Sequence, residues 1–165
     1  MVTKQLFETA LNIHDPWFIK DIQFDPEKKR LDIHIDFHKG SVFHYESKED
    51  NINGTFKAYD TQEKHWRHLN FFEHECYLHA RVPRVQIKEK NVRLINPPWS
   101  GLSNGFTMLF EALVLQLASH MPELRVRTHI KESDYRIWTL LERYVTRALA
   151  NNDYSQLKTV CQRSF

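Results

Sequence analysis

Cysteine, glycine and long apolar runs are all scarce in this chain of 165 residues, and each scarcity excludes a class of protein. The two cysteines, Cys76 and Cys161, are too few for a disulfide framework or a four-thiolate zinc site. We expect both to be reduced thiols in a cytoplasmic protein. The longest apolar run, Ala112 to Leu115, is too short to cross a bilayer. The residues after Met1 lack the apolar core of a signal peptide, so we expect no membrane association.

Enzyme motifs are also lacking. The sequence contains no Gly-rich phosphate-binding loop, no dinucleotide-binding turn and no Gly-x-Ser-x-Gly elbow. The segment Glu73-His74-Glu75-Cys76 is better explained as the surface of a strand than as a nucleophile site. We therefore expect no enzymatic activity and no cofactor. Because the net charge is only +2, any argument for nucleic-acid binding must come from local clusters of basic residues.

The apolar fraction of 41% and the aromatic fraction of 13% are typical of a globular protein. Apolar and polar residues alternate over residues 31–37, which predicts a half-buried strand. Pro83 should lie at a sheet edge or a bulge, because it has no N–H to donate. A short helix is expected over residues 4–12. Further strands are predicted over residues 17–24, 41–45, 65–72, 76–87 and 92–95.

The pattern changes near residue 100. Paired prolines and glycines predict a linker over residues 96–105, and apolar residues then recur with helical spacing. Helices are predicted over residues 106–117, 122–130 and 134–150, the last with Ser133 as N-cap, and one or two turns over 153–159. The sequence therefore predicts an α+β fold, with an antiparallel β-rich domain over residues 1–98 and a helical domain over residues 99–165.

Two strings carry a family resemblance: WRHLNFF at residues 66–72 and YLHARVPRV at residues 77–85. They resemble the amino-terminal region of the ISL-three family of bacterial insertion-sequence transposases. The resemblance extends from about Trp17 to Val160 and is strong from Tyr59 to Val85 and from Gly105 onward. It implies a zinc ribbon followed by a helix-turn-helix, both serving to recognise the DNA ends of the element.

The chain departs from the family pattern at its zinc ligands. The resemblance places the two Cys-x-x-Cys pairs at Tyr45 and Lys48 and at Ile87 and Lys90, none of which is a usual zinc ligand. His65 and His68 do not compensate, because three residues apart on a strand they lie on opposite faces. We expect a degenerate, metal-free ribbon in which Tyr45 and Ile87 pack where the metal would sit.

The family's catalytic domain, which holds its metals with three carboxylates, would begin just after Val160, so we expect a truncated protein that does not cut DNA. Two further departures concern the helices. Arg127 stands where the family has a small residue, and Lys131 replaces the glycine of the turn.

Two groups of residues are candidates for DNA contact. In the helical cluster, Ser133, Tyr135, Arg136, Thr139 and Arg143 would face the major groove, and Arg125, Arg127 and Lys131 would neutralise phosphates. The strand cluster consists of Arg81, Arg84, Lys88, Lys90 and Arg93, with only Glu89 opposing it in sequence. For both clusters the alternative is a solvated charged face.

Three functions remain open. The first is a DNA-binding protein derived from a transposase, such as a truncated transposase or a repressor that binds the terminal repeats of the transposon. The second is a protein–protein interaction module that pairs with intact transposase or another partner. The third is a functionless transposase remnant. A homodimer is expected in the first case, because transposon ends are commonly bound by symmetric pairs.

Overall fold

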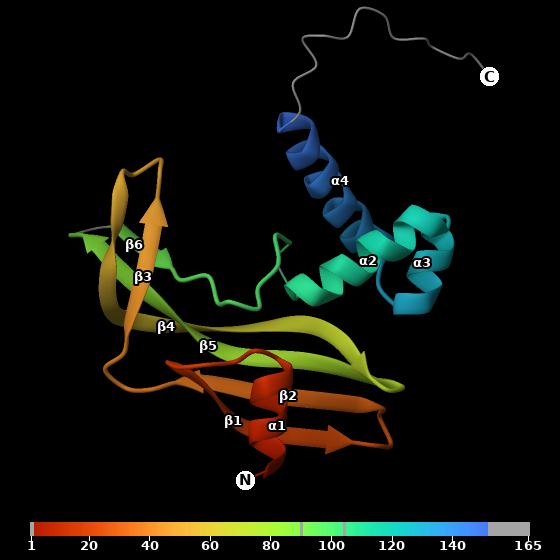
Figure 1. Cartoon of the computed structure of the whole chain (residues 1–165), viewed down its shortest axis with the longest axis horizontal. Helices are drawn as coiled ribbons and strands as arrows, with labels where there is room; N and C mark the ends of the chain where they lie inside the picture. Colours follow the sequence, from red (N-terminus) through yellow and green to blue (C-terminus); the bar gives the residue numbers. More distant parts are fainter. Residues whose placement is uncertain (1, 90, 104, 152–165) are drawn as a thin grey trace, which may run out of the picture. The chain divides into compact units, whose positions relative to one another are not determined.

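The structure is a computed structural model that describes residues 2–89, 91–103 and 105–151 (Figure 1). The chain divides into two compact units, Met1–Leu113 and Val114–Phe165. Residues 99–113 thus belong to the first unit. Lys90, Cys161 and the turns expected over residues 153–159 lie outside the described residues.

The first unit is built on one six-stranded sheet. The strand order is β1-β2-β5-β4-β3, and β6 pairs with β5 beyond the end of β2. Figure 1 shows β4 and β5 as two long, bent strands that run beside each other. The elements are α1 (Val2–Ala10), β1 (Trp17–Asp25), β2 (Arg30–Phe37), β3 (Val42–Ser47), β4 (Ile52–Phe71), β5 (His74–Lys88), β6 (Asn91–Leu94) and the first part of α2 (Met108–His120).

The predicted antiparallel sheet is wrong in one pairing. β2 and β5 run parallel, with Arg30 opposite Glu75 and Ile35 opposite Ala80, whereas the other strand pairs are antiparallel. The β3–β4 excursion lies between β2 and β5 in the chain, and it allows β5 to return in the same direction as β2. Alternation of apolar residues predicts which face of a strand is buried, but not which strand pairs with it.

Strand β4 is much longer than predicted, because the segment from Ile52 to Lys64 is also extended. Gly54 disfavours a strand, and only Phe56 and Ala58 in the middle of this stretch are apolar positions that pack against the core. The pairing with β3, where Tyr45 lies opposite Gly54, supplies the backbone hydrogen bonds that sequence propensity does not favour.

Aromatic and aliphatic side chains fill one face of the sheet. Trp99 makes edge contacts with Trp17 and Trp66, at ring-centroid distances of 5.0 and 5.8 Å. Cys76 lies in the same core as a free thiol, and burial raises its pKa to about 12, so it remains protonated and unreactive at neutral pH. Tyr45 and Ile87 also pack against this core, as predicted.

The second unit contains α3 (Glu123–Ile130) and α4 (Asp134–Ala150), which match the predicted helices closely. Lys131 ends α3 in the left-handed conformation, with φ 53° and ψ 45°, where glycine is favoured. Ser133 is at the N-cap of α4, but its side chain makes no capping hydrogen bond. None of the helices in the described residues is both long enough and apolar enough to span a membrane.

Candidate nucleic-acid interface

Two members of the strand cluster, Arg81 and Arg84, lie on the outer side of the sheet. Along β5 the buried positions are even-numbered up to Val82 and odd-numbered from Val85. This change of phase at Pro83 puts Arg81 and Arg84 on the same, outward side. Pro83 itself comes where pairing with β2 has ended and pairing with β6 begins, so its missing N–H breaks no ladder.

Carboxylates from other strands neutralise much of the strand cluster. The Arg81 guanidinium donates hydrogen bonds to both oxygens of Asp36, at 2.9 to 3.2 Å. Arg84 makes a bidentate pair with Asp60, and this contact raises the pKa of the guanidinium.

Arg93 is 3.3 Å from Asp50 in a third ion pair. The prediction that only Glu89 opposes this cluster is therefore wrong, because the fold brings in acids distant in sequence. Lys88 remains exposed, without a charged partner in the described part of the chain.

The helical cluster surrounds the turn between α3 and α4. Arg127, at the end of α3, forms an ion pair with Asp134 in the first turn of α4. This pairing holds the large Arg127 side chain at the surface. Arg136, in the first turn of α4, donates a hydrogen bond of 2.7 Å to Glu132, which lies between the two helices. These two arginines are thus partly neutralised within the unit.

Other members of the helical cluster are open to solvent. Arg125 and Lys131 are exposed and make no ion pair within the described residues. The Tyr135 side chain is 79% exposed, and Trp138 beside it is 58% exposed. The Thr139 hydroxyl donates 2.7 Å to the Tyr135 carbonyl, which leaves its acceptor positions available. Arg143 is exposed one turn further along α4.

The buried face of α4 is narrower than its apolar pattern suggests. Ile137 and Leu140 are fully buried, whereas Val145 is 57% and Leu149 is 53% exposed. Trp138, Val145 and Leu149 are spaced by seven and four residues, so they form an exposed apolar stripe on one side of the helix.

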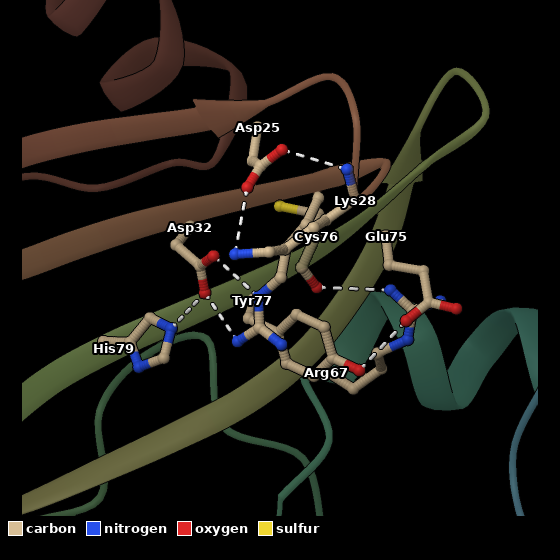
Figure 2. A network of polar contacts seen from close by, with 9 residues as sticks. Asp25, Lys28, Asp32, Arg67, Glu75, Cys76, Tyr77 and His79 are labelled. Carbon is tan, nitrogen blue, oxygen red and sulfur yellow. Dashed lines mark hydrogen bonds and ion pairs between the residues drawn. The ribbon is translucent and has the colours of Figure 1, made fainter.

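A buried arginine explains part of the WRHLNFF string. Arg67 is 2% exposed, donates 2.8 Å to the Asn70 side chain and lies 4.0 Å from Glu75. Its guanidinium also packs over the rings of Tyr77 and Phe110. Figure 2 shows Arg67 and Glu75 together, next to a second group formed by Asp32 and His79. The string therefore contains structural residues as well as surface ones.

Sequence reasoning missed a row of histidines on the outer face. His34 in β2, His79 in β5 and His65 in β4 are register partners across three neighbouring strands. The alternation of residues 31–37 places His34 on the polar face, but no local pattern reveals its neighbours. The prediction that His65 and His68 face opposite ways is confirmed, since His65 is exposed and His68 is buried.

The described residues do not fit the family's zinc ion. Tyr45 and Ile87 are core-packing side chains at two of the four expected ligand positions, and Lys48 at a third is not a zinc ligand. The fourth position, Lys90, is outside the described residues. Among the residues that the structure describes, no group of three or more His, Cys, Asp or Glu side chains could hold a metal ion.

Residues 54–89, which cover most of β4 and all of β5, match the family model described as the zinc-finger of transposase IS204/IS1001/IS1096/IS1165. This region of the chain is transposase-related. The match includes Arg81, Arg84 and Lys88 of the strand cluster. No curated protein and no solved structure matches the chain.

Proposed function

We propose that this chain is a DNA-binding protein derived from a transposase, which binds transposon ends. The similarity of residues 54–89 to a transposase zinc finger carries this proposal. Tyr45 and Ile87 pack against the apolar core. This packing is compatible with a ribbon whose fold is stabilised by apolar contacts instead of by zinc.

The helices α3 and α4 are the better candidate for direct DNA contact. A helix pair joined by a short turn is the arrangement that places the second helix in a major groove, with its first residues toward the bases. In α4 these would be Tyr135, Arg136 and Thr139. Arg125 and Lys131 have the open positive charge that phosphate contacts need, whereas the arginines of the strand cluster are already paired with carboxylates.

A variant series tests this assignment. Arg125→Ala combined with Lys131→Ala removes two exposed charges from the helical cluster, and we expect about a tenfold or greater loss of affinity for a transposon-end duplex. Lys39→Ala combined with Lys48→Ala is the matched control, because both lysines are exposed in loops of the first unit. Equal loss in both double variants would show that net charge, rather than the helical cluster, governs binding.

The exposed apolar stripe favours a second function, a protein–protein interaction module. Trp138, Val145 and Leu149 would pair with a second copy of the chain or with intact transposase. Analytical ultracentrifugation across a concentration series distinguishes this function. Association that persists at high salt and is lost on Val145→Glu supports the module, because apolar contacts are not weakened by salt. A monomer at all concentrations that also fails to bind DNA would leave a functionless remnant.

A further inference from the structure

The row of histidines lies on the outer face of the sheet, away from the core. The rings of His34 and His79 stack at a centroid distance of 4.8 Å and an angle of 17°, and His65 lies 6.1 Å from His79 on the other side. The three side chains come from β2, β5 and β4, so the row spans the strands that carry the unit's core on their other face.

A surface hollow of about 220 Å³ opens along this row. Besides the histidines, its charged lining residues are Lys20, Asp36, Glu63, Lys64 and Arg81. The Nε2 atom of His34 is buried and has no hydrogen-bond partner within the described residues. A buried polar nitrogen without a partner is costly, and a ligand that supplied an acceptor after a small rotation of the ring would satisfy it.

Fixed charges of both signs surround the row. Arg81 and Lys20 both approach Asp36, at 2.9 and 3.8 Å, and Glu63 and Lys64 also line the hollow. Asp21 is the register partner of His34, and Asp32 accepts from Arg30 and contacts His79. Because these carboxylates and cations oppose one another, protonation of the histidines is the change that makes the site more positive. Each protonated ring adds a positive charge and a second N–H donor.

Asp32 orients the middle histidine. Its carboxylate is 2.6 Å from His79 Nε2, a contact visible in Figure 2, and Arg30 holds the carboxylate at 2.7 and 2.8 Å. Burial alone would raise the pKa of Asp32, but the hydrogen bonds from Arg30 and His79 outweigh it and hold the pKa below its usual value. With Nε2–H directed at Asp32, the Nδ1 atom of His79 is left for another partner.

We propose that this hollow is a site for a tetrahedral oxyanion, a phosphate group, that fills when the histidines become protonated. A phosphate has several acceptor oxygens for His34, His79, His65 and Lys20. It also offsets the repulsion between two stacked imidazolium rings. The site does not depend on the helical cluster and goes beyond the proposed DNA contact of α3 and α4.

Sulfate is the first probe, because its charge stays at −2 between pH 5.5 and 7.5 while inorganic phosphate changes its own protonation. Histidine side-chain NMR of the full chain, at constant ionic strength with chloride as reference, follows binding and ring titration together. Because each protonated ring adds a positive charge and a donor, we expect sulfate affinity to rise as the pH is lowered from about 7.5 to about 5.5, and the side-chain signals of His34 and His79 to shift on sulfate addition.

His34→Gln and His65→Gln should each abolish this acid-dependent gain. His65 is exposed, so its variant keeps the test valid if His34→Gln disturbs folding. His44→Gln is the matched control, since His44 is exposed on β3 and does not line the hollow. Sulfate affinity that is unchanged by pH, or equal in the wild type and both variants, would overturn the proposal. So would stoichiometric zinc uptake by the row in the absence of sulfate binding.

Two further binding measurements, one with a DNA duplex and one with inorganic phosphate, identify the source of the phosphate group. If binding to a DNA duplex gains an acid-dependent component that His65→Gln removes, the site takes a backbone phosphate. If inorganic phosphate binds but DNA binding is indifferent to pH and to His65→Gln, the site takes a free phosphate or a small phosphate ester. Both outcomes support the oxyanion site. DNA binding through the helices at pH 7.5 is measured separately, so either proposal can fail alone.

Discussion

At the scale of single residues, the first unit contains a charged side chain where a hydrophobic one would be usual. Arg67 is 2% exposed between the sheet and the residues around Phe110, and its backbone also bonds to Gly105 and Thr107. A buried guanidinium is tolerated only when its donors are satisfied, and here Asn70 and the carbonyls of His68 and Cys76 accept them.

Arg67→Ala should destabilise the first unit by about 3 kcal/mol, because it leaves a cavity and strips Asn70 and Glu75 of their partner. Urea unfolding followed by tryptophan fluorescence measures the change. Arg125→Ala, at an exposed position, is the control and should change the unfolding free energy by less than about 0.5 kcal/mol. Equal effects of the two substitutions would contradict the role assigned to Arg67.

His68 should make the stability depend on pH. Burial lowers the pKa of His68 to about 4, with a further contribution from Arg67. The unfolded chain has a histidine pKa near 6.5, so it takes up a proton that the folded state resists. The contribution of His68 is therefore complete above pH 6.5 and is lost progressively as the pH falls toward 4, by about 3 kcal/mol in total.

The His68→Asn variant tests this dependence. Its amide can take the place of Nδ1, which lies 2.9 Å from the Thr107 hydroxyl, but it does not titrate. Unfolding free energies measured from pH 7 to pH 4 should fall less steeply for the variant than for the wild type. Parallel curves for the two proteins would show that His68 is not the group responsible.

At the scale of elements, Lys131 in the turn between α3 and α4 has an unfavourable backbone conformation and is also a candidate for contact with DNA phosphates. Lys131 has φ 53°, which is unfavourable for a residue with a Cβ, and its N–H bonds to the Arg127 carbonyl. Glycine is the residue that suits such a turn best. A lysine keeps the geometry at a cost of about 1 kcal/mol and adds a positive charge beside α4.

Lys131→Gly should stabilise the second unit by about 0.5 to 1 kcal/mol, because glycine adopts positive φ freely. Lys131→Ala is the matched control, since it removes the same charge and retains the strain. Thermal unfolding followed by circular dichroism should rank glycine above both lysine and alanine. If alanine stabilises as much as glycine does, charge and not backbone conformation is the cause.

The elements also show what a sequence can predict. The bounds of α4 and of the strand β2 follow from periodicity and local residue preference, whereas the special turn at Lys131 is expected only from the family resemblance. The parallel β2–β5 pairing, the first half of β4 and the ion pairs of Arg81, Arg84 and Arg93 do not follow. They depend on cross-strand register between distant segments, and local alternation carries no information about register.

At the scale of the whole molecule, the linker region contributes to the first unit. Glu111 is fully buried and accepts hydrogen bonds from the backbone of Leu102 and Ser103, at 2.9 and 2.6 Å. Phe106 and Phe110 are each 1% exposed, and Phe106 forms a bridge with Arg67 of β4. Residues 99–103 and 105–113 therefore belong structurally with the sheet, although the sequence predicts a linker up to residue 105 and a helical domain beyond it.

A fragment of residues 1–113 should unfold at a clearly higher temperature than a fragment of residues 1–98. The shorter fragment exposes the surface that Phe106 and Phe110 cover and leaves Arg67 without its neighbours. Differential scanning calorimetry of the two fragments makes the comparison. Identical unfolding temperatures for the two fragments would show that residues 99–113 do not stabilise the sheet, and that the domain boundary lies after residue 98.

The most direct test of DNA binding is a salt series with the wild-type chain. Affinity for a labelled transposon-end duplex and for a random duplex is measured by fluorescence anisotropy from about 50 to 300 mM salt. We predict that the logarithm of the binding constant falls linearly with the logarithm of salt concentration, with a slope of about −3 or steeper, and that the transposon-end duplex binds more tightly. No binding at the lowest salt, or an affinity that does not change with salt, would contradict a DNA-binding function.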